Sequence, residues 1–165
     1  IRDDLVTGVQ TCALPISTRY PLNYISLRYF NPYGPRSFNP ENAFNAYSSV
    51  VGIFLNRKKE GKKLLVTGDG QQKRDFVHVL DLAKANYKAA IHPEKLNTSF
   101  NVGFGDTLSV LDLAKMIDGD NYELIDKREG EAEITFADTT KLKTMLGWEP
   151  GMDIREYINQ ELAEI

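Results

Sequence analysis

The feature that most constrains this sequence is an apolar strand that ends in a rigid polar turn, LRYFNPYGPR at residues 27–36. Its apolar and aromatic residues favour a strand, and Pro32, Gly34 and Pro35 stop that strand and fix the backbone beyond it. Asn31 therefore stands at a strand end, which is where open α/β sheets bind ligands. The spacing alone also fits an ordinary strand followed by a turn.

A second segment, LLVTGDGQQKRDFVHV at residues 64–79, predicts a strand, a glycine turn, another strand and a helix. Further motifs come after it in order: FNVG at 100–103, REGE at 128–131 and LGWEP at 146–150. With the RYFN and YGPR motifs, these resemble the C-terminal part of the extended short-chain dehydrogenase/reductase family. More narrowly, they resemble its NAD-dependent nucleotide-sugar epimerases and dehydratases, from about Thr18 to the C-terminus.

The resemblance implies an α/β fold, the C-terminal part of an NAD(P)-binding Rossmann-type extended short-chain dehydrogenase. Residues 24–30 and 99–102 are expected to be late strands of its parallel sheet. The other elements are expected to form a small α/β substrate-binding domain, so that 17–165 is a nucleotide-sugar-binding part. A sheet truncated in this way should expose an apolar edge.

Apolar residues at helical spacing predict two helices, over 46–56 and 79–90. Their inward faces are expected to carry Val50, Ile53 and Phe54 in the first, and Val79, Ala83, Tyr87 and Ala90 in the second. Three more helices are expected after the capping residues Ser109, Asp138 and Asp153. Short strands are expected over 64–67, 99–102 and 122–125.

Residues 1–16, IRDDLVTGVQTCALPI, do not fit the rest of the chain, because they lack helical or strand periodicity. The run at 4–8 superficially resembles the first strand of a dinucleotide fold, but the second and third glycines are missing. The stretch resembles a translated sequencing-adapter read-through and lacks the layout of a signal peptide. We therefore expect a non-native, unstructured prefix, with native sequence from near Ser17 or Thr18.

Composition narrows the class of protein. The net charge is -3, so no basic footprint suggests a nucleic acid partner. No apolar stretch approaches the roughly 20 residues that span a bilayer, so no membrane association is expected. The single cysteine, Cys12, excludes an internal disulfide framework and permits a cytoplasmic location. No metal site is expected.

Catalysis in the resembled family depends on NAD and a Tyr-x-x-x-Lys pair. NAD takes a hydride from the sugar ring, the tyrosine is the general base, and the lysine lowers the pKa of that tyrosine. None of the eight tyrosines here has a lysine four residues later, and the glycine-rich NAD loop is absent. The chain is therefore expected to hold no catalytic residue, with NAD bound mainly by the missing N-terminal half.

The resemblance assigns ligand contacts residue by residue. It places Phe30 near the nicotinamide, Asn31 on the sugar diphosphate and Thr67 near the base. It places Ala46 and Val50 on the helix under the nucleotide. The residue types alone also fit a core aromatic at Phe30, a turn cap at Asn31 and simple helix packing at the two helix positions.

Two arginines are the strongest candidates for a pyrophosphate, because a planar guanidinium makes bidentate, charge-assisted bonds to phosphate. The resemblance places Arg74 and Arg128 there, and Glu131, where many relatives have Asp, on the ribose hydroxyls. The alternative for the arginines is a surface ion pair, for instance Arg74 with Asp75 or Asp69. Asp75 is otherwise expected to orient its turn.

The resemblance favours a UDP-glucose 4-epimerase as the complete protein, with a nucleotide-sugar as ligand and a homodimeric state. A nucleotide-sugar 4,6-dehydratase, a UDP-glucuronate decarboxylase and a non-catalytic nucleotide-sugar-binding module stay open as alternatives. His78, at a strand-to-helix junction, is expected to be structural because the family supplies its base elsewhere. The upstream gene sequence would separate an enzyme from a binding module.

Overall fold

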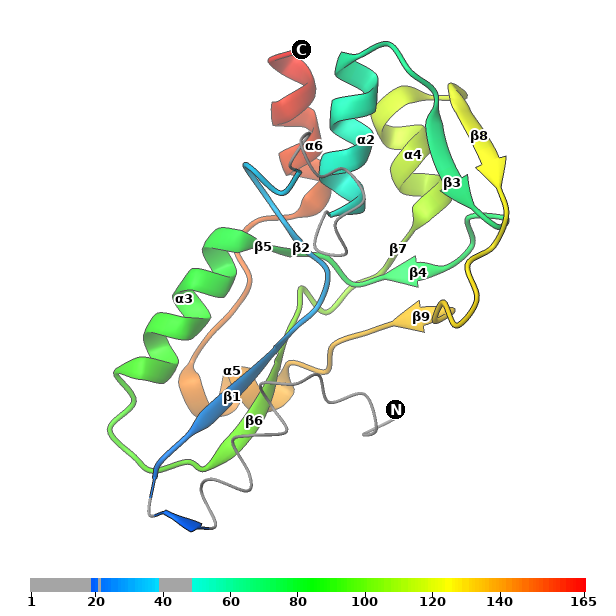
Figure 1. The fold of residues 1–165 in the computed structure, drawn as a ribbon. Helices are drawn as coiled ribbons and strands as arrows, with labels where there is room; N and C mark the ends of the chain where they lie inside the picture. The colour runs from blue at the N-terminus through cyan, green and yellow to red at the C-terminus, as the bar shows by residue number, and fades with distance from the viewer. Residues whose placement is uncertain (1–18, 21, 39–48) are drawn as a thin grey trace.

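Two parallel strands, β1 (Ile25–Tyr29) and β6 (Thr98–Val102), form the sheet of the first of two packed regions (Figure 1). The computed structural model describes residues 19–20, 22–38 and 49–165. The parallel pairing of the two strands is confirmed, with ends shifted by one residue from those expected. Within the described residues β6 is the one hydrogen-bonded neighbour of β1.

Helices α3 (Val79–Ala90) and α5 (Thr140–Leu146) pack together beside this sheet. They enclose an apolar core whose buried members are Val77, Leu82, Ala85, Phe100, Val102, Leu142, Leu146 and Trp148. With Asp138 as its N-cap, the helix was expected to begin at Thr139. Helix α5 begins at Thr140 instead, because Thr139 occupies the N-cap position. The Asp138 carboxylate nevertheless accepts from the Thr140 N–H at 3.0 Å, so it does stabilise this helix end.

The bounds of α3 are as predicted, but its expected inward face is wrong. Leu82 and Ala85 are buried, whereas Tyr87 is 65% exposed. The Asp81 carboxylate, only 1% exposed, accepts from the Gly151 N–H at 2.9 Å and also from the Met152 N–H. This tertiary contact turns the polar Asp81 side of α3 inward, which apolar spacing cannot anticipate.

The second region contains another parallel strand pair, β3 (Leu64–Thr67) with β8 (Tyr122–Ile125). Three helices pack with it, namely α2 (Val50–Lys59), α4 (Val110–Asp118) and α6 (Ile154–Ala163) (Figure 1). Its core includes Val51, Phe54, Leu64, Val66, Leu113, Ile117 and Ile158. The expected caps at Ser109 and Asp153 are confirmed, since their side chains accept from the N–H groups of Asp112 and Arg155.

Helix α2 is observed from Val50, and 46–48 lie outside the described residues. Val51, Phe54 and Leu55 are its buried residues, so the inward face expected at Val50, Ile53 and Phe54 is only partly right. Val50 and Ile53 are half-buried against the same core. The predicted face was rotated by about one residue, because apolar residues occupy more than one side of this helix.

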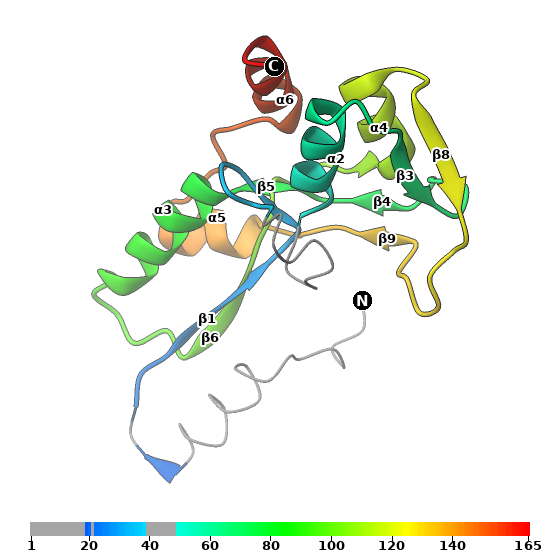
Figure 2. The same ribbon diagram turned by 45° about the horizontal axis from the view of Figure 1, so that its top comes forward.

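Short strands join the two regions and bring distant segments side by side. Strand β4 (Lys73–Arg74) lies between β7 (Leu108–Ser109) and β9 (Ile134–Thr135), antiparallel to β7 and parallel to β9. Beside them, β2 (Pro32–Tyr33) pairs with β5 (Val77–His78). Figure 2 shows β4 and β9 beneath α2 and α4, with β5 between these strands and α3.

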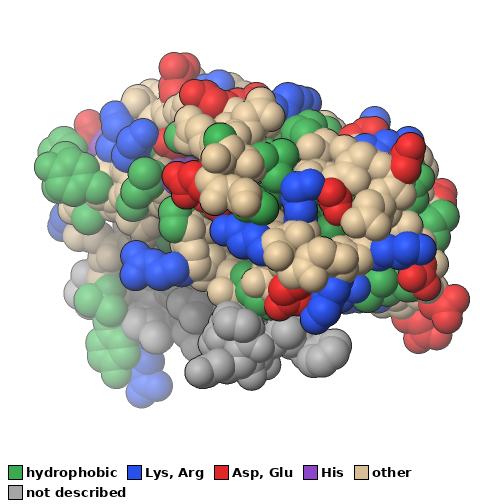
Figure 3. Space-filling model, turned by 90° about the horizontal axis from the view of Figure 1, so that it is seen from above, with side chains coloured by type: hydrophobic (Ala, Val, Ile, Leu, Met, Phe, Trp, Pro, Cys, Tyr) green, Lys and Arg blue, Asp and Glu red, His purple; other side chains and the backbone are tan. Residues whose placement is uncertain are grey.

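Three further observations bear on the sequence expectations. Residues 1–16 and Ala46 lie outside the described residues. Within the described ranges, no helix has the length and apolar character needed to cross a membrane, and no three acidic, histidine or cysteine side chains gather as metal ligands. Cationic and anionic side chains are interspersed on the face seen in Figure 3.

Candidate functional site

Glu131 joins two of the predicted site residues. Its Oε1 accepts from Arg74 Nη2 at 2.9 Å, and its Oε2 accepts from the Thr67 hydroxyl at 3.2 Å. The side chains of Arg74 and Glu131 are only 11% and 21% exposed. Two residues of one motif, seven positions apart, therefore meet a carboxylate from a segment 57 or more residues further along the chain. The site is partly desolvated, and an ion pair there is stronger than on an open surface.

Arg74 is fixed by its place in the central strand of the three-stranded sheet. It pairs with Leu108 on one side and Thr135 on the other. Its Nη1 donates to the Lys73 carbonyl at 2.9 Å, which leaves the rest of the guanidinium directed at Glu131. The alternative of an ion pair is what the structure shows for Arg74, but the partner is Glu131 and not Asp75 or Asp69, and the pair is largely buried.

The glycine turn before β4 brings Thr67 to this carboxylate. Gly70 has a φ of +72°, and a Cβ there would lie 2.7 Å from Val66 Cγ1 and 2.8 Å from Leu111 Cβ. Only glycine fits this turn, on both conformational and steric grounds. Gln72 then reaches back across the turn, where its Nε2 donates to the Thr67 hydroxyl at 2.9 Å and to the Thr67 carbonyl at 3.1 Å.

Asn31 lies at the edge of the same cluster. Its Nδ2 donates to the Asp75 carbonyl at 2.7 Å and to the Thr135 hydroxyl at 3.0 Å. A side-chain amide has two N–H donors, and both are committed here. A ligand would therefore meet Oδ1, which accepts, so this geometry suits a sugar hydroxyl better than the phosphate oxygen expected from the sequence.

Phe30, Val50 and Arg128 are the other predicted site residues in the described part of the chain. Phe30 is half-buried after β1, and its N–H donates to the Val102 carbonyl at 3.0 Å. Val50 is half-buried against the second core, as simple helix packing would have it. Arg128 is exposed, three residues before Glu131, and its carbonyl accepts from the Glu131 N–H at 3.4 Å.

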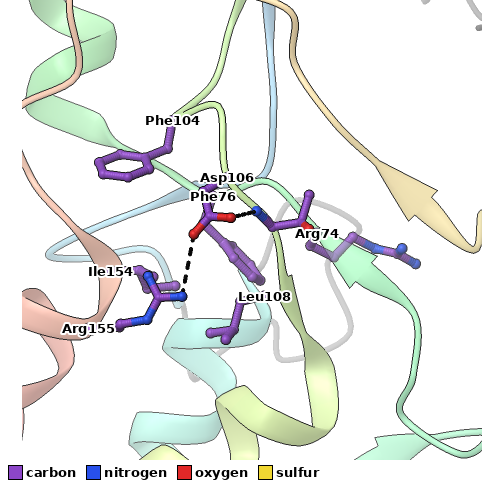
Figure 4. A pocket seen from close by; sticks show the side chains of 8 residues that line it. Arg74, Phe76, Phe104, Asp106, Leu108, Ile154 and Arg155 are labelled. Atoms are coloured by element: carbon purple, nitrogen blue, oxygen red, sulfur yellow. Dashed lines mark hydrogen bonds and ion pairs between the residues drawn. The ribbon is translucent and has the colours of Figure 1, made fainter.

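Two hollows lie in the described surface, and Arg74 is the one residue of this cluster that lines either of them. One lies among Arg74, Phe76, Asp106 and Arg155, and its volume of about 10 Å³ holds no more than a single water molecule (Figure 4). Figure 4 shows the Arg74 guanidinium pointing away from it. A groove of about 580 Å³ lies along α3, lined by Leu80, Ala83, Lys84, Tyr87, Lys88, Ile91, Trp148 and Glu149, none of them a predicted site residue.

His78 is structural in this arrangement. It is 3% exposed, and its Nδ1 accepts from the Leu80 N–H at 3.3 Å at the start of α3. Its ring lies 5.2 Å from the Tyr33 ring and 5.3 Å from the Tyr157 ring. Burial lowers the pKa of His78 and raises the pKa of both tyrosines far above that of an exposed phenol, so neither tyrosine is prepared to act as a base.

Sequence reasoning missed two members of the cluster, Gln72 and Thr135. Gln72 lies inside the GDGQQKRDF motif, whose spacing places it opposite Thr67 once the turn forms, so a signal did exist. Thr135 had no local signal. It enters the cluster because β9 pairs with β4 across 61 residues of sequence.

The fold and the ordered motifs define an α/β protein of the extended short-chain dehydrogenase/reductase type. The chain belongs to the NAD dependent epimerase/dehydratase family, whose sequence model matches residues 9–103. The match begins inside the 1–16 segment, whose status as a prefix stays a prediction.

Similar proteins agree with this membership. The chain is 35% identical over 146 residues to a putative UDP-glucose 4-epimerase of Methanocaldococcus jannaschii, covering 86% of this chain and 45% of that protein. It is also similar to the crystal structure of a Thermotoga maritima UDP-glucose 4-epimerase with UDP-glucose, with a TM-score of 0.80 and 33% identity. That match covers 94% of this chain and 50% of the epimerase. A Bacillus anthracis dTDP-glucose 4,6-dehydratase in complex with NAD shares the fold, with a TM-score of 0.77, 23% identity, and coverage of 93% and 48%. The chain spans about half the length of the curated relatives it matches.

Proposed function

We propose that the chain is the C-terminal, substrate-binding portion of an NAD-dependent nucleotide-sugar 4-epimerase of the UDP-glucose 4-epimerase type. In such an enzyme a hydride leaves sugar carbon 4 and returns to the opposite face. The observation that carries the proposal is the convergence of Thr67 and Arg74, on either side of the glycine turn, with Glu131 from a distant segment. The similarity to a UDP-glucose 4-epimerase holding UDP-glucose supports it.

Five of the predicted site residues have a proposed role in holding the ligand itself. The Arg74 guanidinium, and Arg128 from the loop beside it, would bind the pyrophosphate, since each makes charge-assisted bonds to phosphate. Glu131 would accept from ribose hydroxyls, and Thr67 would lie near the base. Asn31 would accept a hydroxyl of the sugar through Oδ1, because its N–H groups are committed to the protein.

The proposed roles of the remaining residues concern the nucleotide and the cofactor. Val50 and Ala46 would line the helix under the nucleotide, and Phe30 would lie near the nicotinamide. When bound, NAD supplies the hydride acceptor. The sequence of this chain has neither the glycine loop that cradles the NAD pyrophosphate nor the Tyr-x-x-x-Lys pair. We therefore propose that NAD is held mainly by the half of the family fold that this chain does not cover, in a cytoplasmic homodimer.

A non-catalytic nucleotide-sugar-binding module is the second candidate, because the cluster of Thr67, Arg74 and Glu131 could hold a nucleotide-sugar in either class of protein. A dehydratase or decarboxylase of the same family would share the binding cluster and differ in catalytic groups elsewhere. The gene sequence upstream distinguishes an enzyme from a binding module, because only an enzyme requires the glycine loop and the Tyr-x-x-x-Lys pair there.

The proposal is tested by calorimetric titration of the purified 165-residue chain with UDP, dTDP, UDP-glucose and NAD. We expect UDP and UDP-glucose to bind and NAD to bind far more weakly. Arg74→Ala should weaken UDP binding about tenfold to a hundredfold, the loss of a charge-assisted bond of roughly 1.5–3 kcal/mol. The control is Lys73→Ala, which removes an exposed cation from the same strand. Equal losses in both variants, or none in Arg74→Ala, would reject the site.

A further inference from the structure

The buried carboxylate of Asp75 joins two segments that are far apart in the sequence. Its Oδ1 accepts from the Phe104 N–H at 2.7 Å, and its Oδ2 accepts from the Gly105 N–H at 3.1 Å and the Ala137 N–H at 3.0 Å. Asp75 is 0% exposed. Three backbone donors, from the segment after β6 and the segment after β9, therefore converge on one side chain.

The carboxylate of Asp75 lies so close to Gly103 that no larger side chain fits there. A Cβ on Gly103 would lie 2.9 Å from both oxygens of Asp75 and 2.4 Å from the Ala137 Cβ. The φ of Gly103 is not in the left-handed region, so the need for glycine here is steric. The glycine of the FNVG motif thus makes room for the aspartate of the RDF motif, although 28 residues of sequence separate them.

The main chain of Asp75 is tied to the candidate site on both sides. Its N–H donates to the Thr135 carbonyl at 3.0 Å, and its carbonyl accepts from Asn31 Nδ2 at 2.7 Å. Its neighbour is Arg74, which pairs with Glu131. Asp75 therefore stands between the residue proposed to meet the sugar and the residues proposed to meet the diphosphate and ribose.

The donors also explain how a carboxylate is tolerated at a fully buried position. Burial raises the pKa of Asp75, while the three N–H bonds oppose that rise by stabilising the charged form. Arg74, the neighbouring cation, pairs with Glu131 instead. The N–H donors thus make the carboxylate a fixed anchor for the backbone.

We infer that Asp75 is a positioning residue that sets the spacing between Asn31 and the Arg74–Glu131 pair, without touching the ligand. This inference rests on the proposed function. Loosening Asp75 should move the sugar-binding amide relative to the diphosphate-binding arginine. The affinity for UDP-glucose should therefore fall more than the affinity for UDP, which lacks the sugar.

The test compares Asp75→Asn with Asp81→Asn in this same chain. Both aspartates are buried and accept from backbone N–H groups, but Asp81 ties α3 to residues 151–152, away from the site. We expect both variants to melt at lower temperature. Only Asp75→Asn should lower the ratio of UDP-glucose affinity to UDP affinity, by about fivefold or more, which corresponds to about 1 kcal/mol.

A second variant covers the case in which Asp75→Asn does not fold. Gly103→Ala combined with Ala137→Gly relieves the contact between the two β-carbons and leaves the new methyl 2.9 Å from the carboxylate oxygens. It displaces the carboxylate while keeping its charge, and the same fall in the affinity ratio is expected.

An unchanged ratio in a folded Asp75 or Gly103 variant, or an equal fall in Asp81→Asn, would overturn the inference alone. Failure of the unaltered chain to bind either ligand would overturn the proposed function, and the inference with it.

Discussion

Arg74 and Glu131 form an ion pair in which Nη2 lies 2.9 Å from Oε1, although 57 residues separate them in the sequence. The pair joins the residue proposed to bind the pyrophosphate with the residue proposed to bind the ribose. An incoming diphosphate would compete with Glu131 for the guanidinium. Glu131 uses one carboxylate oxygen for Arg74 and the other for Thr67, so a single side chain holds both.

The first prediction concerns this competition. Glu131→Gln removes the charge but keeps an acceptor for Thr67, so inorganic pyrophosphate should bind about fivefold more tightly, equivalent to about 1 kcal/mol. Titration of pyrophosphate into both proteins measures the change. The control is Glu133→Gln, which removes an exposed charge two residues away. An equal gain in the control would mean that net charge, and not release of Arg74, is responsible.

The second prediction concerns Arg128, which is exposed on the segment that carries Glu131. Arg128→Ala should weaken UDP binding about tenfold to a hundredfold through the loss of charge-assisted bonds. Arg128→Lys should recover only part of this, because an ammonium cannot make the bidentate fork. The variant Lys127→Ala, an exposed neighbour, serves as control. UDP affinity that stays the same in Arg128→Ala would make this arginine a surface charge.

The third prediction concerns pH and His78. Because burial lowers the pKa of His78, the unfolded chain binds more protons than the folded one just below the ordinary histidine pKa of about 6.5. The free energy of unfolding should therefore fall as pH decreases from 7 towards 5. In His78→Asn, which keeps an acceptor for the Leu80 N–H, this slope should flatten. Urea unfolding at several pH values measures it, and an unaltered slope in the variant would contradict the assignment.

The groups packed around His78 set the pH range in which the change in unfolding free energy reports on this histidine. Tyr33 and Tyr157 stay neutral throughout, since burial raises the pKa of both. Asp81 favours the charged imidazole, but burial of the ring outweighs it. The pKa of Asp81 is itself lowered by the N–H groups of Gly151 and Met152, together with Lys84, against the cost of burial. Stability lost through Asp81 therefore appears below pH 4, outside the histidine range.

The fourth prediction concerns catalysis. The 165-residue chain alone should not convert UDP-galactose to UDP-glucose, because its sequence has no Tyr-x-x-x-Lys pair. A coupled assay of protein purified from a host that lacks its own epimerase checks this. Measurable turnover above a heat-treated sample would show that a catalytic group exists elsewhere in the chain.

How far the sequence predicted the fold depends on the distance over which each feature is decided. The strands over 64–67 and 122–125 and the caps at Ser109 and Asp153 are confirmed, because local residue types govern them. The inward face of α3 was wrong because Asp81 is held by N–H groups 70 residues away. The alternative of an ion pair at Arg74 named Asp75 and Asp69, which are near in sequence, whereas the observed partner, Glu131, is 57 residues away.

The sequence by itself determined the family and the order of the main helices and strands, and it proposed candidate binding side chains, because ordered motifs and residue chemistry are local properties. The tertiary structure alone decided which of those side chains meet. In that structure Arg74 pairs with Glu131, both N–H groups of Asn31 donate to the protein, and three backbone N–H groups donate to Asp75. Such contacts require distant strands to pair first, and a buried polar group then accepts whichever partner the packing brings within hydrogen-bond reach.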